Sequence, residues 1–317
     1  FSTVCNDVFE YQYLHNTTFH QWCNLLKKDP LIQEASNSLN DYKNKLPFLP
    51  ISFFKSHEIK TTDFTPAITF ESSGTTQQNT SKHFVKDLAV YEESFLKGFS
   101  LFYGDISKYC ILALLPSYLE RTGSSLVLMA DKLINLSGHT QSGFYLNDLE
   151  ALYKTLVELE AMKQPTILLG VTFALLDFLE LYPIELKHTI IMETGGMKGR
   201  KKEMTRMEVQ EQLIRGSGAE NIHSEYGMTE LLSQGYSFGK GVFNCPPWMK
   251  VLVRKEDNPL HVSTVGKGLI NIIDLANINS CSFIATDDVG IVYEDGSFEV
   301  LGRMDNSDIR GCSLMYN

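Results

Sequence analysis

The sequence has no long apolar run and no excess of basic residues. A membrane-spanning helix needs roughly 20 consecutive, mostly apolar residues, and no segment approaches that length. The formal net charge is -10, whereas a nucleic-acid-binding protein needs a basic face for the phosphate backbone. We therefore expect neither a membrane span nor a nucleic-acid partner.

The six cysteines are irregularly spaced, and no Cys-x-x-Cys pair is present. This pattern argues against a metal cage and against a disulfide framework in a chain of 317 residues. The sequence also opens without the basic and then apolar pattern of a secretory signal. Together these features predict a cytoplasmic location.

Two common catalytic motifs are also absent, the Gly-x-x-x-x-Gly-Lys-[Ser/Thr] P-loop and the Gly-x-Ser-x-Gly nucleophile elbow. What is present is an ordinary globular composition, with 43% hydrophobic and 21% charged residues. Residues 1–60 predict an N-terminal helical segment packed on the core. Residues 61–238 alternate apolar strands with helical patterns, which predicts an α/β core with parallel strands. Residues 239–317 contain short β-rich runs, which predict a small β-rich subdomain with a short C-terminal tail.

The first polar motif is Ser72-Ser73-Gly74-Thr75-Thr76, which directly follows an apolar stretch. Small residues let the backbone close around phosphate oxygens, and the hydroxyl and N–H groups supply hydrogen-bond donors. Lys82, a little further along the chain, adds a positive charge for the same anion. These residues indicate a phosphate-binding loop, although a surface turn rich in Ser, Thr and Gly has the same composition.

The second motif is Tyr226-Gly227-Met228-Thr229-Glu230. A tyrosine beside a glycine offers a ring face on which a base can stack. Thr229 and Glu230 can reach a phosphate and a Mg2+ ion, a cation that prefers oxygen ligands. A polar helix start has the same residues, so the motif alone leaves both interpretations open.

A third group lies between Thr286 and Gly311. The carboxylate of Asp288 can hold both hydroxyls of a ribose, and Arg303 can pair with a carboxylate or phosphate through its planar guanidinium. Asp295-Gly296 between them predicts a hairpin turn whatever the function. Acidic pairs and Gly-Arg dipeptides also occur on ordinary β-rich surfaces.

The order of these motifs resembles that of the adenylate-forming superfamily, which includes acyl-CoA synthetases, peptide-synthetase adenylation domains and firefly luciferase. The similarity covers roughly residues 68–311. It implies an α/β fold of the kind found in the N-terminal core of these enzymes, with mixed or parallel sheets and a small β-rich subdomain. It also implies that residues 61–238 bind ATP and the acyl substrate, with Mg2+ as the metal.

The resemblance also implies a role for each matching residue. The phosphate loop would consist of Ser72, Ser73, Gly74, Thr75, Thr76 and Lys82. The adenine site would be lined by Gly195, Gly196, Tyr226 and Gly227. Thr229 would contact phosphate, and Glu230 would ligate Mg2+. Asp288 would bind the ribose, and Arg303 would contact ribose or phosphate.

Some residues depart from the superfamily pattern. Gln77 stands where a glycine is usual, and Asp287 replaces the glycine of Thr-Gly-Asp. The sequence also ends soon after Arg303, so we expect most of the mobile C-terminal domain, with its adenylation lysine, to be lacking. The tail instead contains Cys312.

In its tail, and in the segments 48–58 and 114–121, the chain is similar to the acyl-protein synthetases (LuxE type) of the fatty-acid reductase complex of bacterial bioluminescence. Those enzymes form an acyl-AMP and then take the acyl group onto their own cysteine. The resemblance implies a fatty or other carboxylic acid substrate, a thioester at Cys312, and an acyl reductase or acyltransferase as partner. A mixed anhydride acylates a thiolate readily, so the chemistry is coherent.

Three alternatives remain open at this point. Cys312 can be an incidental tail cysteine. The chain can be the core of a phenylacetate-type acyl- or aryl-CoA ligase. It can also be a non-catalytic module that binds a nucleotide or an acyl group.

Overall fold

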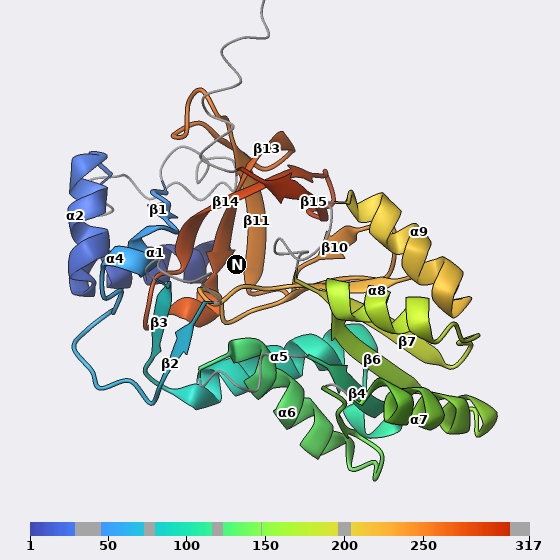
Figure 1. Ribbon diagram of the computed structural model, residues 1–317. Coiled ribbons are helices and arrows are strands. Elements are labelled where there is room, and N and C mark those ends of the chain that lie inside the picture. The colour runs from blue at the N-terminus through green and yellow to red at the C-terminus, as the bar shows by residue number, and fades with distance from the viewer. Residues whose placement is uncertain (29–45, 73–79, 116–122, 147, 196–203, 305–317) are drawn as a thin grey trace, which may run out of the picture. The chain divides into compact units, whose positions relative to one another are not determined.

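A computed structural model describes residues 1–28, 46–72, 80–115, 123–146, 148–195 and 204–304 (Figure 1). These residues fold into two units. The parallel-strand unit comprises the described residues of Ile68–Ser73 and Asp87–Pro246. The antiparallel unit comprises those of Phe1–Ala67, Gly74–Lys86 and Pro247–Asn317.

The parallel-strand unit is built on a sheet in the order β5-β4-β6-β7-β8-β9-β10. The strands from β5 to β8 are parallel, and β9 and β10 are added antiparallel. Every residue of β4 and β6 is buried, as expected for parallel strands that are covered on both faces. The strands are β4 (Cys110–Leu114), β5 (Gly143–Phe144), β6 (Thr166–Val171), β7 (Thr189–Thr194), β8 (His223–Tyr226), β9 (Gly235–Ser237) and β10 (Val242–Asn244).

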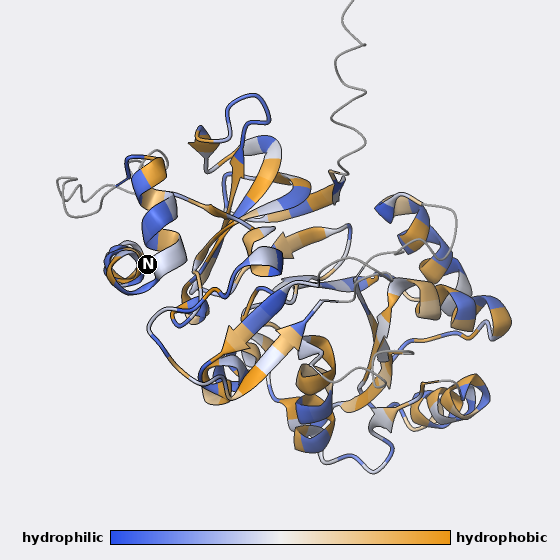
Figure 2. Cartoon of the chain, turned by 60° about the vertical axis from the view of Figure 1, so that its left-hand side comes forward, coloured by the Kyte–Doolittle hydropathy of each residue, from blue (hydrophilic) through white to orange (hydrophobic). Residues whose placement is uncertain are grey.

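Helices follow the strands of this unit and begin and end at residues that suit those positions. Ser124 caps α6 by accepting a hydrogen bond from the backbone of Val127, and Thr205 and Glu208 form a capping box on α9. The helices show mixed hydrophobic and hydrophilic colouring, as expected when one face is buried (Figure 2). The helical elements are α5 (Leu88–Tyr103), η1 (Ile106–Lys108), α6 (Ser125–Ser137), α7 (Leu149–Ala161), α8 (Thr172–Leu181) and α9 (Arg206–Ser217).

The antiparallel unit contains strands in the order β12-β11-β13-β14-β15, with β1 running parallel to β14. Gly296, at a φ of 85°, forms the turn between β14 and β15, and Asp295 accepts a hydrogen bond from the backbone of Ser297 at 2.9 Å. The expected hairpin is therefore present. The strands are β1 (Leu49–Pro50), β3 (Lys82–Val85), β11 (Met249–Arg254), β12 (Val262–Ser263), β13 (Gly266–Asp274), β14 (Phe283–Val292) and β15 (Phe298–Arg303).

The N-terminal helices belong to the antiparallel unit. They are α1 (Ser2–His15) and α2 (Thr17–Leu25), and α4 (Phe53–Ser56) and η2 (Leu275–Asn277) lie in the same unit. Phe283 of β14 packs against Phe9, Phe19 and Phe48, with ring centroids 5.7 to 6.4 Å apart. This aromatic cluster joins the N-terminal helices to β14 in one core.

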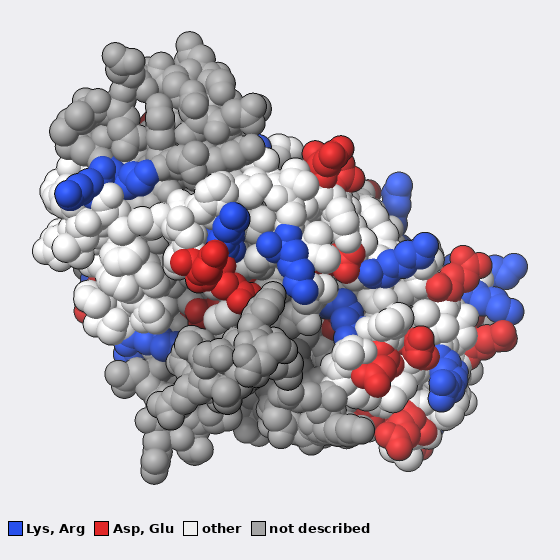
Figure 3. All heavy atoms as spheres, turned by 90° about the horizontal axis from the view of Figure 1, so that it is seen from above, with Lys and Arg blue, Asp and Glu red and all other residues white. Residues whose placement is uncertain are grey.

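These observations confirm the α/β class and the β-rich character that the sequence predicts near its C-terminal end. Among the described helices, none is both long and apolar enough to cross a membrane. On the face shown in Figure 3, acidic and basic side chains of the described residues are interspersed.

Candidate active site at the carboxyl ends of the parallel strands

Gly195 and Tyr226 lie at the carboxyl ends of two neighbouring strands. Gly195 follows β7, Tyr226 ends β8, and the register pairs Thr194 with Glu225. In open α/β sheets ligands bind at the carboxyl ends of the strands. The structure therefore places two of the expected adenine-site residues at the carboxyl ends of the strands, where a ligand is expected.

The turn after β8 holds Gly227, Thr229 and Glu230. The side chains of Tyr226 and Glu230 are almost fully buried, at 8% and 6% exposure. A Cβ on Gly227 would lie 2.4 Å from Glu225 Oε1, so a larger residue would collide with that carboxyl group. A larger residue at this position would thus require the Glu225 carboxyl group to move.

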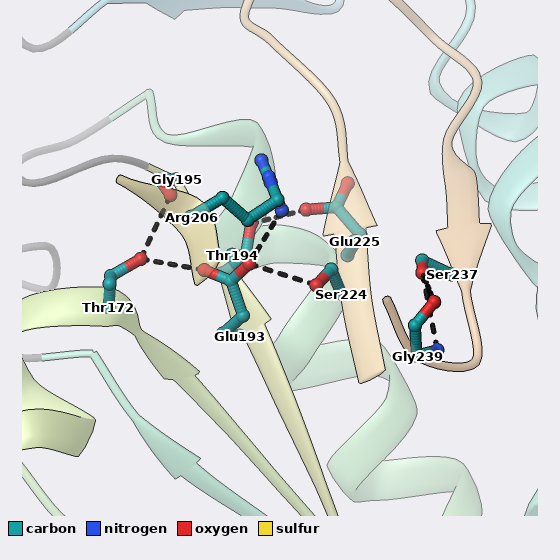
Figure 4. A network of polar contacts seen from close by, with 9 residues as sticks. All are labelled: Thr172, Glu193, Thr194, Gly195, Arg206, Ser224, Glu225, Ser237 and Gly239. Carbon is teal, nitrogen blue, oxygen red and sulfur yellow. Dashed lines mark hydrogen bonds and ion pairs between the residues drawn. The ribbon is translucent and has the colours of Figure 1, made fainter. Parts of the chain in front are cut away.

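Glu193, on β7, is the centre of a buried polar network (Figure 4). Its Oε1 atom accepts hydrogen bonds from Arg206 Nη1 at 2.8 Å and from Ser224 Oγ at 2.9 Å. Its Oε2 atom accepts one from Thr172 Oγ1 at 2.8 Å, and that hydroxyl oxygen also lies 3.0 Å from the carbonyl oxygen of Gly195. The network ties β7 and β8 to the starts of α8 and α9.

Glu225 is a second buried carboxyl group on the neighbouring strand. Burial raises its pKa to about 7, a hydrogen bond from Thr194 lowers it, and the nearby charge of Glu193 raises it. The Thr194 hydroxyl donates to Glu225 Oε2. A carboxyl group with this pKa changes its charge near neutral pH.

Neither Glu193 nor Glu225 is among the residues expected from the sequence, and Arg206 is not either. A signal for Glu193 is nevertheless present, because it directly follows the apolar residues of β7, whereas Glu225 lies in a polar strand, His223–Tyr226, and has no such signal. A charge next to a buried apolar run is costly unless it is paired, so Glu193 marks a structural or functional site. Arg206 has no comparable signal, because an arginine in the first turn of a helix does not stand out in the sequence.

Asp288 and Arg303 lie opposite each other in the antiparallel unit, on β14 and β15. The backbone N–H of Asp288 donates to Thr286 Oγ1 at 3.2 Å. Arg254 joins this strand to β13 by donating to the carbonyl oxygen of Thr286 at 2.6 Å and to that of Ile270, on β13, at 2.8 Å. The expected ribose-binding pair is therefore a cross-strand pair.

The phosphate-loop residues are only partly described. Ser72 follows β2 (Ile68–Glu71) in the parallel-strand unit, where the backbone N–H of Glu71 donates to the carbonyl oxygen of Gly123 at 2.9 Å. Lys82 begins β3 in the antiparallel unit and is exposed. Ser73, Gly74, Thr75, Thr76, Gly196 and Cys312 lie outside the described residues.

Known structures share this fold. ATP-bound MatB from Rhodopseudomonas palustris is 15% identical, with a TM-score of 0.55, over 77% of this chain and 50% of that one. A luciferase-like enzyme from the nonluminescent mealworm Zophobas morio is 19% identical, with a TM-score of 0.50, over 78% and 60% of the two chains. A malonyl-CoA ligase with methylmalonyl-CoA and AMP bound is 15% identical, with a TM-score of 0.50, over 77% and 54%.

The fold is thus that of the core of the adenylate-forming enzymes, and the chain spans about half the length of the MatB chain. The family described as Acyl-protein synthetase, LuxE, matches residues 1–317, and the chain belongs to this family. No curated protein matches the chain.

Proposed function

We propose that this chain activates a carboxylic acid, expected to be a fatty acid, with ATP and then transfers the acyl group to its own Cys312. The observation that carries the proposal is the placement of Gly195, Tyr226 and the turn to Glu230 at the carboxyl edge of the parallel strands. Membership of the acyl-protein synthetase family supports the same chemistry.

Two displacements make up the reaction. In the first, a carboxylate oxygen of the acid attacks the α-phosphorus of ATP, the bond to the β-phosphate oxygen breaks, and pyrophosphate leaves. In the second, the Cys312 thiolate attacks the acyl carbon, AMP leaves, and the thiol proton passes to solvent. An acyl reductase or an acyltransferase would take the acyl group from the thioester.

The proposed roles of the individual residues are those that the sequence motifs imply. Tyr226 stacks on the adenine beside Gly195, Gly196 and Gly227, and Asp288 holds the ribose hydroxyls. Arg303 contacts ribose or phosphate, and Thr229 contacts phosphate. The phosphate loop is formed by Ser72, Ser73, Gly74, Thr75, Thr76 and Lys82.

Glu230 suits a Mg2+ ion that is shared with the nucleotide. In the described part of the chain no group of three or more His, Cys, Asp or Glu is arranged to hold a metal. Mg2+ commonly takes one or two protein carboxylates and completes its octahedral shell with substrate phosphates and water. A bound Mg2+ would neutralise the phosphate charge, and Glu230 is the carboxylate that would hold it.

The other cysteines are less suited to receive the acyl group. Of the described cysteines, only Cys245 is not buried. Burial raises the pKa of Cys5 and of Cys281 to about 12, so both stay as thiols, and a thiol is a poor nucleophile. This leaves Cys312 and Cys245 as candidate acyl acceptors, and a variant of each serves as the control for the other.

The test combines exchange of labelled pyrophosphate into ATP with mass spectrometry of the intact protein after incubation with ATP, Mg2+ and a panel of acids. The wild type should exchange pyrophosphate and gain one acyl mass. Cys312→Ala should keep the exchange and lose the adduct, whereas Cys245→Ala should keep both. An adduct that survives in Cys312→Ala would refute self-acylation at this residue.

An acyl-CoA ligase is the second candidate, because a malonyl-CoA ligase shares the fold. The same incubation with added CoA distinguishes the two activities. Acyl-CoA formed at the same rate by Cys312→Ala would favour the CoA ligase. Binding of ATP with no exchange for any acid would instead favour a non-catalytic module.

A further inference from the structure

Arg206 lies between a buried carboxylate and an aromatic pair that ends at Tyr226. Its Nη1 atom is 2.8 Å from Glu193 Oε1. Its guanidinium carbon lies 5.1 Å from the centre of the Phe243 ring, which is within the range of a cation–π contact. The Phe243 ring lies 5.9 Å from the Tyr226 ring, at an interplanar angle of 61°. These contacts form a continuous path from β7 through α9 and β10 to the end of β8.

Helix stability does not account for an arginine at this position. Arg206 is the first residue of α9, where the helix dipole disfavours a cation. The N-terminus of the helix is already capped, because Thr205 and Glu208 bond to each other's backbone. Glu193 is only 4% exposed and needs a partner for its charge, but a lysine in place of Arg206 would also supply that charge.

The position of the Arg206 side chain is also restricted from the β9–β10 connection. Gly241 has a φ of 69°, and a Cβ there would lie 2.6 Å from Arg206 Cδ. The backbone of this connection therefore approaches the aliphatic part of the side chain closely, while Glu193 and Phe243 hold the guanidinium. A side chain held in this way is suited to fixing its neighbours in place.

We propose that Arg206 is a positioning residue for the nucleotide, because it holds Phe243 against Tyr226 and so fixes the ring on which adenine stacks. The inference rests on the proposed function, in which Tyr226 receives the base. Arginine suits this role because its planar guanidinium stacks on a ring and still donates to a carboxylate, whereas a lysine ammonium is a point charge. Arg206→Lys thus keeps the charge and removes the stacking.

The experiment measures binding of ATP, AMP and inorganic pyrophosphate by isothermal titration calorimetry. The proteins are the wild type, Arg206→Lys, Phe243→Leu and the double variant. Each single variant should weaken ATP and AMP binding by about fivefold to tenfold, with pyrophosphate binding unchanged. The double variant should be no weaker than the weaker single variant, because both residues act through one ring. In pyrophosphate exchange, KM for ATP should rise while kcat changes by less than about twofold.

Arg215→Lys, at the exposed end of the same helix, is the matched control and should bind like the wild type. Unchanged ATP affinity in Arg206→Lys and Phe243→Leu would overturn the inference, as would an equal loss of pyrophosphate binding. If Arg206→Lys fails to fold, Phe243→Leu alone carries the test. A wild type that binds ATP without exchange would refute the proposed function, and the affinities would still decide the role of Arg206. A wild type that binds no ATP would refute both.

Discussion

Two buried carboxyl groups lie on neighbouring strands, and their partners differ. Glu193 accepts hydrogen bonds from an arginine and two hydroxyl groups. Glu225 accepts one from Thr194, and the tyrosines near it, Tyr91 and Tyr236, have their own pKa values raised by burial. The burial of Glu225 therefore brings its pKa close to neutral pH.

The raised pKa of Glu225 makes the folded state depend on pH. Below about pH 4.5 the group is protonated in both the folded and the unfolded chain. As the pH rises towards 7, the unfolded chain loses the proton first, so the free energy of unfolding falls, and the loss is complete above pH 7. Glu225→Gln cannot ionise and does not undergo this loss.

The stability of Glu225→Gln relative to the wild type should therefore increase by about 2 kcal/mol when the pH is raised from 5 to 8. Urea unfolding at the two pH values measures the difference. The exposed Glu220→Gln is the control and should show no such change. The same stability difference at both pH values would show that Glu225 titrates as an ordinary carboxyl group.

At the scale of elements, the hairpin of β14 and β15 places Asp288 opposite Arg303. The register shifts between Val289 and Gly290, directly after Asp288. Such bulges re-aim side chains and require backbone room. A Cβ on Gly290 would lie 2.3 Å from the carbonyl oxygen of Glu299 and 2.6 Å from Ile270 Cδ1.

Gly290→Ala should therefore destabilise the protein by about 1–3 kcal/mol, because the new methyl group forces the two strands apart. Gly302→Ala, on the partner strand, is the matched control, since a Cβ there meets nothing within 4 Å. Its cost should stay within about 0.5 kcal/mol. Urea midpoints for the two variants test this, and equal midpoints would mean that β14 adjusts to the methyl group.

At the scale of the whole molecule, one side chain of α1 joins the N-terminal helices to the distant segment 277–282. Gln12 Nε2 donates to the carbonyl oxygens of Asn277 and Ile278 at 2.9 and 3.1 Å. Gln12 Oε1 accepts from the backbone of Ser282 at 2.9 Å. Burial of these groups makes the loss of their partner costly.

Gln12→Ala should lower the free energy of unfolding by about 1–3 kcal/mol, because it leaves buried backbone groups without a partner. Gln21→Ala on α2 is the control, since Gln21 is exposed. Urea unfolding of both variants measures the effect. A loss no larger than that of Gln21→Ala would show that water replaces the amide at this interface.

The α/β class and the family were predictable from the sequence alone. Buried parallel strands such as Cys110–Leu114 and Thr166–Val171 produce continuous apolar runs, and the Asp295-Gly296 turn needs residues of particular backbone freedom. These are local properties, so they are visible in the order of the residues. The roles proposed for the motif residues stay predictions.

Only the tertiary structure decided which distant residues meet. The pairing of β7 with β8 brings Gly195 and Tyr226 to the same end of the sheet, and both Glu193 and Glu225 are buried on these strands. The contact of Arg206 with Phe243, and that of Phe9 on α1 with Phe283 on β14, join segments that no local pattern relates. The physical reason is that these contacts depend on strand order and burial, which arise from packing along the whole chain.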